Sequence, residues 1–315
     1  MKTRLLLVPL SLFLCVQPLQ AQQPTYLGQL PKWERIQSET TNQSFTTKDV
    51  KYGGISFQVD ATLATEVKAE TVRAALEGKP SDLWPEHVAF TLVGGRLPRG
   101  VPSDFPQLRV FSVQRFRDAV DTGYRDFVKS DVFPAPKSWT NDFDEEVSVL
   151  NALLRVKPGQ STVQSFLKRI RHKTDFNKGM PFLPLWEAQQ AFISHVKYVS
   201  FRNGSGVFFL TQWNTETSQI ANDGLEYAFQ GITRDGRYYV YAEFSVSAPT
   251  LPNGDEPAVI AWNEKNYLLP RQSRKYQDYI RRVVAQLQAL RGDEFQPKLK
   301  TFERLISSLD VQPNN

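Results

Sequence analysis

The sequence predicts an α+β fold, in which an antiparallel β-sheet of consecutive hairpins packs against helices as an α/β sandwich. Residues 188–247 have the pattern of four strands joined in two hairpins, rich in aromatic and β-branched residues. A helical segment precedes them at about 115–175, and two stretches with a helical apolar stripe follow. Strands that are segregated from helices in this way are typical of α+β folds.

The first 21 residues have the pattern of an export signal. Lys2 and Arg4 precede an apolar stretch at 5–16, and Leu19-Gln20-Ala21 forms a small-residue cleavage site. We therefore expect the mature chain to begin at Gln22 and to work outside the cytoplasm, in the periplasm or the extracellular space.

Cys15 is the only cysteine and lies inside this signal, so the mature chain is expected to hold no thiol and no disulfide. A lipid anchor on Cys15 is not expected, because the bulky Leu14 stands where lipidation needs a small residue. After Ala21 no apolar run approaches the roughly 20 residues that span a bilayer, so we expect no transmembrane segment in the mature chain.

Residues 22–48 are polar, with recurring Gln, Ser, Thr and Asn, and are expected to form a linker. A single α+β domain is expected over 49–311. Its first strand lies around 55–59, where apolar and polar residues alternate, and the signal recurs at 87–93 and 109–113.

Three helices are expected near 115–128, 145–155 and 163–170. The third has the clearest pattern, because its apolar residues recur on one face and the spacing of Ser161 and Gln164 predicts a capping box. That face carries Val163, Phe166, Leu167 and Ile170.

Two hairpins follow. The first is predicted from strands at 192–201 and 207–213 around Asn203-Gly204-Ser205-Gly206, and the second from strands at 225–233 and 238–246 around Asp235-Gly236. A loop with four Pro or Gly residues, at 249–257, leads to two terminal helices. Their stripes are Tyr276, Tyr279, Ile280, Val283, Val284, Leu287 and Leu290, and Leu299, Phe302, Leu305, Ile306 and Leu309.

A succession of short motifs runs through this region. It consists of Leu183-Pro184-Leu185, Val196-Lys197-Tyr198, Asn203-Gly204-Ser205-Gly206-Val207, Phe209-Leu210-Thr211-Gln212, Tyr227, Phe229-Gln230-Gly231 and Asp235-Gly236-Arg237-Tyr238-Tyr239-Val240. The succession resembles a family of uncharacterised exported bacterial proteins, mostly predicted lipoproteins, over about 52–311. The resemblance implies export and one domain, but no activity and no site residues. The order of elements is similar, more loosely, to PsbP/Mog1-like sandwiches, whose members are mainly assembly and binding proteins.

The charge balance is mild. The chain has 38 Lys and Arg against 33 Asp and Glu, and loss of Lys2 and Arg4 leaves 36 against 33, a net charge of +3. We therefore expect no nucleic-acid partner.

Asp142, Asp144, Glu145 and Glu146 form an acidic cluster. At an expected helix start, such anions complement the helix dipole and cap free amides. The alternative is an exported hydrolase that uses paired carboxylates in a cleft. A calcium loop is not expected, because the residues after Asp142 lack further ligands and the turn glycine.

The three histidines are His87, His172 and His195, and no pair has the i, i+4 spacing of a helical zinc site. No nucleophile motif accompanies them. We therefore expect no catalytic residue, no metal and no cofactor.

The concentrated basic run is Lys168, Arg169, Arg171 and Lys173, at the end of the third helix. Positive charge is favourable there, and a solvated last turn is expected. The alternative is contact with an anionic envelope surface or an acidic partner.

Aromatic residues fall on both faces of the predicted hairpin strands. Tyr239 and Tyr241 share one face, which either packs under helices or forms a partly exposed platform for a ligand. With Trp213 they are the candidate ligand-binding residues. The sequence thus predicts an exported, non-catalytic binding or assembly module, whose partner is an unknown envelope protein or a small ligand.

Overall fold

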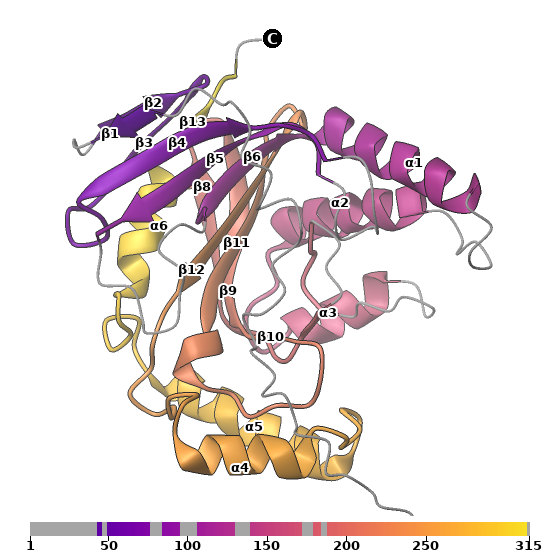
Figure 1. Cartoon of the computed structure of the whole chain (residues 1–315), viewed down its shortest axis with the longest axis vertical. Coiled ribbons are helices and arrows are strands. Elements are labelled where there is room, and N and C mark those ends of the chain that lie inside the picture. Colours follow the sequence, from indigo (N-terminus) through magenta and orange to yellow (C-terminus); the bar gives the residue numbers. More distant parts are fainter. Residues whose placement is uncertain are drawn as a thin grey trace, which may run out of the picture.

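The computed structural model describes residues 43–45, 49–75, 84–94, 106–129, 139–171, 179–183 and 188–313. The expected signal at 1–21 lies outside these ranges. The α+β prediction is confirmed, because the described chain forms a large antiparallel sheet packed with six helices (Figure 1).

The strands are β1 (Gln43–Phe45), β2 (Asp49–Tyr52), β3 (Ile55–Gln58), β4 (Glu66–Val72), β5 (His87–Val93), β6 (Leu108–Ser112), β7 (Gln189–Gln190), β8 (Ser194–Phe201), β9 (Gly204–Thr211), β10 (Trp213–Asn214), β11 (Glu226–Thr233), β12 (Tyr238–Ser245) and β13 (Asp310–Val311). The helices are α1 (Val113–Lys129), α2 (Trp139–Val156), α3 (Val163–Ile170), α4 (Pro257–Asn266), α5 (Arg274–Ala289) and α6 (Leu299–Ser307), with a 3-10 turn, η3, at Asn222–Gly224.

The main sheet has eight antiparallel strands in the order β1-β4-β5-β6-β12-β11-β9-β8. Both predicted hairpins, β8–β9 and β11–β12, are confirmed and lie side by side. β12 then joins them to β6, which places the N-terminal strands and the hairpins in one sheet. Two small sheets, β13-β3-β2 and β10-β7, complete the fold.

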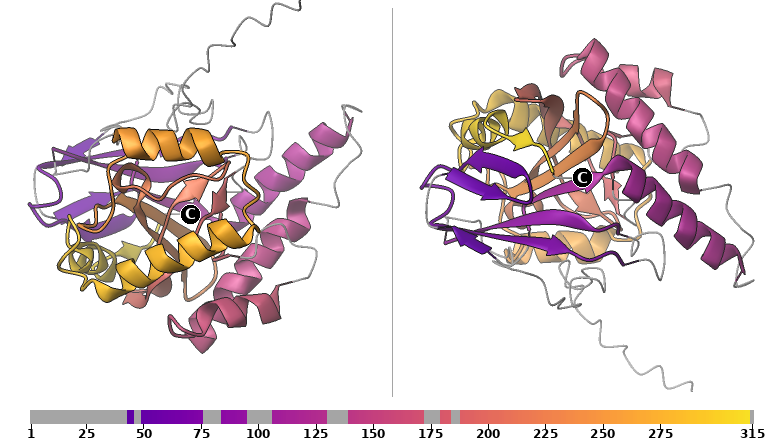
Figure 2. Two further views of the ribbon diagram at one scale, coloured as in Figure 1. Left: turned by 90° about the horizontal axis from the view of Figure 1, so that it is seen from below. Right: turned by 90° about the horizontal axis from the view of Figure 1, so that it is seen from above.

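Both faces of the main sheet are covered, so the molecule has three layers. One core lies between the sheet and α5 and α6, and the other between the sheet and α1, α2 and α3. Figure 1 shows α6 on one side of the sheet and α1, α2 and α3 on the other, and the left view of Figure 2 shows α5, with α4, across the lower end of the strands. Alternation along β12 divides its side chains between the cores: Val240, Ala242 and Phe244 face the first, and Tyr239 and Tyr241 the second.

The turn of the first hairpin is shorter than predicted. β8 ends at Phe201 and β9 begins at Gly204, so Gly204 and Gly206 lie in the strand instead of the turn. Their role is close packing, because a Cβ on Gly206 would meet the Phe229 ring at 2.2 Å and one on Gly204 would meet the Phe201 ring at 2.2 Å.

Three further details differ from expectation. The predicted capping box is wrong, because the Thr162 hydroxyl donates to Gly159 O and no side chain caps α3. α4 was missed, since Pro257 was taken as a loop residue although proline suits a first helical turn. β1 lies inside the expected linker, where it pairs with β4 and forms one edge of the main sheet.

Helices α3, α5 and α6 bury most residues of the predicted stripes, and the partly buried ones are Ile170, Tyr279, Val284 and Leu290. The described residues contain no helix that is long and apolar enough to cross a membrane.

Candidate functional site

A block of polar side chains lies on the sheet face that α1, α2 and α3 cover. β11 contributes Glu226 and Gln230, and β12 contributes Tyr241 and Glu243. Gln230 is directly opposite Tyr241, while Glu243 is opposite Ala228, which separates Glu226 from Gln230. Because residues two apart on a strand share a face, the register brings all four polar side chains to one side.

The two acidic residues form what we call the carboxyl pair, Glu226 and Glu243. Glu243 is 6% exposed, and its Oε1 accepts a hydrogen bond of 2.8 Å from Trp213 Nε1. Glu226 is partly exposed as a residue, but its Oε2 atom is buried. Two carboxyl groups are therefore held together in a place that is poor in water.

This environment changes the acidity of the pair. Burial raises the pKa of Glu226 well above its ordinary value, and the neighbouring Glu243 carboxylate, with a hydrogen bond between the two, raises it further. Burial and both carboxylates also raise the pKa of Tyr241 well above its ordinary value. This environment favours the protonated form of Glu226, and Tyr241 keeps its hydroxyl proton.

Three aromatic rings form a wall beside the carboxyl pair. The rings of Phe182 and Trp213 are 4.0 Å apart between centroids, and the Tyr241 ring meets Phe182 edge-on at 6.2 Å. Trp213 is only partly buried. This aromatic wall (Phe182, Trp213 and Tyr241) therefore runs from the core toward the surface.

Several buried polar atoms of this block have no hydrogen-bond partner among the described residues. They are Glu226 Oε2, Gln230 Nε2 and Tyr241 Oη. A buried polar group that lacks a partner costs about 1–3 kcal/mol, so three of them on neighbouring residues are typical of a ligand or water site.

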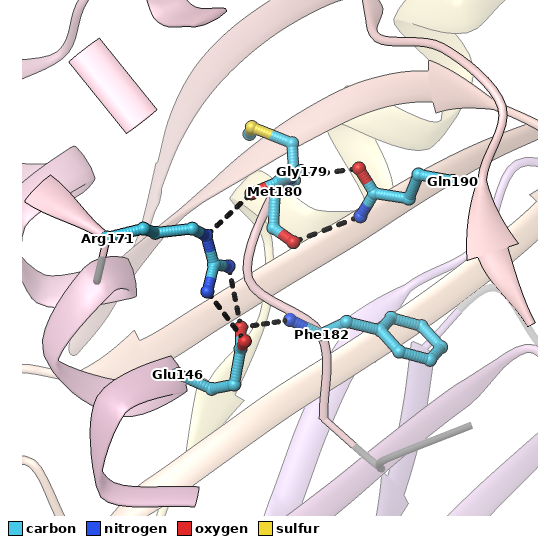
Figure 3. A network of polar contacts seen from close by, with 6 residues as sticks. All are labelled: Glu146, Arg171, Gly179, Met180, Phe182 and Gln190. Carbon is cyan, nitrogen blue, oxygen red and sulfur yellow. Dashed lines mark hydrogen bonds and ion pairs between the residues drawn. The ribbon is translucent and has the colours of Figure 1, made fainter. Parts of the chain in front are cut away.

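A buried ion pair holds Phe182 in place. Arg171 donates to both carboxylate oxygens of Glu146, at 2.7 and 2.9 Å, and Glu146 Oε2 also accepts from the Phe182 backbone N–H (Figure 3). The Arg171 and Glu146 side chains are 2% and 7% exposed. Residues 179–183 are thereby fixed across the polar block.

The same network reaches Trp213. The Gln190 side chain bonds to both the backbone N–H and the carbonyl of Met180, at 2.8 and 3.0 Å (Figure 3). Gln190 also pairs with Trp213 between β7 and β10. Farther along the segment, the Tyr239 hydroxyl donates to Leu183 O at 2.7 Å and also contacts Gln230 Oε1. The aromatic wall is therefore built on a rigid support.

The block continues toward β6 and β5. The Arg109 guanidinium lies over the Trp84 ring at 5.3 Å and over the Tyr241 ring at 5.8 Å. His87 is buried and stacks on Phe111, and burial lowers the pKa of His87 to about 3, with a smaller contribution from Arg109. His87 is therefore neutral near neutral pH.

The three predicted aromatic residues, Tyr239, Tyr241 and Trp213, all lie at this site. They do not form an exposed platform. Tyr239 and Tyr241 are 1% and 0% exposed, because α1, α2 and α3 cover their face of the sheet. The covered alternative is thus confirmed for both tyrosines. Only Trp213 retains partial exposure.

The predicted acidic cluster does not converge. α2 begins at Trp139, so Asp142 and Asp144 lie inside the helix; both are exposed, and Asp144 pairs with Arg117. Glu146 points inward to Arg171 instead of capping the helix. The structure therefore does not bring these four carboxylates together in one site.

The predicted basic patch is divided. Lys168 and Arg169 are exposed, as expected, but Arg171 is buried against Glu146, which removes its charge from the surface. Lys173 and His172 lie outside the described residues. His195 bonds to Leu287 O at 2.8 Å, a structural contact with α5.

Sequence reasoning missed both members of the carboxyl pair. One signal was available. The residues around Glu243 in its strand are mostly apolar or aromatic on both faces, so the strand is expected to be buried and Glu243 with it. The partner Glu226 becomes apparent only from the register of β11 and β12. No group of three or more His, Cys, Asp or Glu side chains in the described chain is placed to hold a metal ion.

Comparison with protein-family models, curated proteins and solved structures finds no match to this chain. The resemblances noted from the sequence therefore stay predictions, and function is argued from the site alone.

The raised pKa of Glu226 predicts a pH-dependent stability. Between pH 4.5, its ordinary pKa, and its raised folded-state pKa, the folded protein keeps a proton that the unfolded chain has released. The free energy of unfolding is therefore expected to fall as the pH rises through this range. Glu226→Gln removes the titrating group, so its free energy of unfolding should fall less.

Urea unfolding of both proteins near pH 4.5 and near pH 7 measures this difference. Equal changes in wild type and variant would contradict a raised pKa at Glu226.

Proposed function

We propose that this protein is an exported, non-catalytic binding module of the bacterial envelope, and that it takes a small polar ligand at the carboxyl pair. The observation that carries the proposal is the combination of the carboxyl pair with three buried polar atoms that lack partners. A ligand that satisfies these atoms removes their desolvation cost and is bound specifically for that reason.

The arrangement of the site favours a small ligand. The carboxyl pair lies on the sheet beneath helices, and the segment that carries Phe182 is fixed by the ion pair of Glu146 and Arg171. Trp213 and Glu226 are the partly exposed members, so we place the entrance beside them. A ligand held between groups that are fixed in this way is expected to be compact.

A second candidate is a carboxylate-dependent hydrolase. It is favoured by the raised pKa of Glu226 beside Glu243, since two adjacent carboxyls of different acidity activate water in aspartic proteases. The carboxyl pair, and not the acidic cluster of α2, is then the catalytic group.

Mass spectrometry of natively purified protein tests the proposal. Wild type produced with its own signal is expected to carry one small molecule that is released on denaturation, and Glu243→Gln is expected to carry less. Asp144→Asn, which alters an exposed carboxylate, is the matched control. An unliganded wild type, together with hydrolysis of a model ester or peptide that Glu243→Gln abolishes, would favour the hydrolase.

Export makes a separate prediction. The mature N-terminus is expected to be Gln22, because Leu19 and Ala21 occupy the cleavage positions. Intact mass and N-terminal sequencing of the exported protein measure it. A diacylglyceryl-modified chain that begins at Cys15 would show lipidation instead.

A further inference from the structure

We propose that helices α4 and α5 dock on the surface of an anionic phospholipid membrane, with Tyr267 and Leu268 inserted among the lipids and the basic side chains against the phosphates. The inference goes beyond the proposed function. It concerns other residues than the carboxyl pair, and it does not depend on the ligand there.

Exposed apolar side chains gather at the end of α4. The large apolar residues that are exposed in the described part of the chain are Val156, Ile260, Tyr267 and Leu268, so three of these four lie between residues 260 and 268. Leu268 is the most exposed of them, at 78%. A single exposed apolar side chain is ordinary on a protein surface, whereas a cluster of them marks an interaction site.

The turn that displays Leu268 is fixed in place. On one side of it, the Asn266 side-chain oxygen accepts a hydrogen bond of 2.9 Å from Lys275 Nζ. On the other side, the Leu269 carbonyl accepts a hydrogen bond of 2.6 Å from the Thr217 hydroxyl. Leu268 is therefore held outward by an ordered turn, and its insertion into a partner costs little further ordering.

Positive charge surrounds these apolar side chains. From the start of α4 to the end of α5, over residues 257–289, the chain has six Lys or Arg and two acidic residues, a net charge of +4. The net charge of the whole chain is +5, so this short segment holds most of it. The exposed basic residues of the segment are Lys265, Arg274, Lys275, Arg281 and Arg282.

The basic side chains of α5 point away from the core. The face of α5 that packs inward buries Tyr276, Ile280, Val283 and Leu287. By helical periodicity, Arg274 and Arg281 lie on the opposite face, where both pair with Asp278. The left view of Figure 2 shows α4 and α5 together across the lower end of the strands, so the apolar turn and the basic face belong to one end of the molecule.

An anionic membrane matches both parts of this surface. Lipid phosphates pair with arginine and lysine, while tyrosine and leucine enter the boundary between head groups and acyl chains. A side chain that is 78% exposed, such as Leu268, projects from the surface instead of lining a groove, which suits insertion into a deformable lipid layer. Each basic side chain near such a membrane strengthens the attachment about fivefold.

Sedimentation with lipid vesicles tests the proposal. The purified protein is expected to bind vesicles made of equal parts of phosphatidylglycerol and phosphatidylcholine, and to bind vesicles of phosphatidylcholine alone much less. Binding should also weaken when sodium chloride is raised from about 0.1 M to about 1 M, because the Debye length then falls from about 10 Å to about 3 Å.

Leu268→Ser removes the inserted side chain and should weaken vesicle binding at least about tenfold. Val156→Ser is the matched control, because Val156 is also apolar and is 52% exposed on another helix. It should bind as wild type does. Both positions are exposed, so the melting temperatures of the two variants are expected to stay close to that of wild type.

The charge is tested separately. The double variant Arg274→Gln, Arg282→Gln should bind anionic vesicles roughly thirtyfold less tightly. The control is Arg155→Gln, Lys168→Gln, which removes the same net charge from exposed positions of α2 and α3 and should bind as wild type does.

Three outcomes would overturn the proposal. They are a wild type that binds neither kind of vesicle, equal binding to both kinds, and an equal loss of binding in the control variants. If wild type binds no vesicles and is a dimer in solution that Leu268→Ser makes monomeric, a second copy of the chain covers this face and the membrane assignment is wrong.

Discussion

Glu146→Gln is expected to lower the free energy of unfolding by about 3–5 kcal/mol. The substitution leaves the Arg171 guanidinium buried, with 2% of its side chain exposed, and without the carboxylate that now accepts two of its hydrogen bonds. A buried charge that loses its partner keeps its full desolvation cost, which is why the expected loss is large. Urea unfolding followed by circular dichroism measures it.

Two comparisons separate this mechanism from general damage. Asp144→Asn breaks an exposed ion pair with Arg117 and should cost no more than about 1 kcal/mol. The double variant Glu146→Leu, Arg171→Met replaces both charges by apolar groups and should recover much of the loss. A loss below about 1 kcal/mol in Glu146→Gln alone would show that water reaches this ion pair.

The same variant reports on the site. Glu146 holds the backbone of Phe182, whose ring packs on Trp213. Release of this segment should therefore alter the fluorescence of Trp213 and weaken binding at the carboxyl pair, even under conditions in which the variant stays folded.

The fold was largely predictable because its signals are local. The stripes of α3, α5 and α6 and the turn at Asp235-Gly236 each depend on residues within one or two turns of chain, and the structure confirms them. α4 carries no such signal, since most of its side chains are exposed and its apolar residues do not form one stripe. Periodicity detects helices that bury one face, so this helix escaped it.

The site was less predictable because its contacts are not local. Glu226 and Glu243 become neighbours only through the register of β11 with β12, and Glu146 meets Arg171 across 25 positions of the chain. From the sequence alone, each of these four charged residues is expected to lie on the solvated surface. Arg171 in particular was assigned to a basic surface, because a helix end with four cations has the usual pattern of a solvated turn.

Phe166→Ala is expected to destabilise the protein by roughly 3–5 kcal/mol. Phe166 is 5% exposed and packs in the core between the sheet and α1, α2 and α3, so its truncation removes buried apolar surface and leaves a cavity. Ser165→Ala changes an exposed neighbour on α3 and should have an effect within about 0.5 kcal/mol. A loss below about 1 kcal/mol for Phe166→Ala would mean that α3 is peripheral to this core.

Arg171 directly follows α3, which couples this helix to the buried ion pair. If the cavity left by Phe166→Ala lets α3 shift, the bond from Arg171 to Glu146 is already weakened in that variant. The double variant Phe166→Ala, Glu146→Gln is then expected to lose less stability than the sum of its parts. Strict additivity would instead show that α3 keeps its position after truncation, and that the ion pair fixes residues 179–183 independently of the packing of the helix.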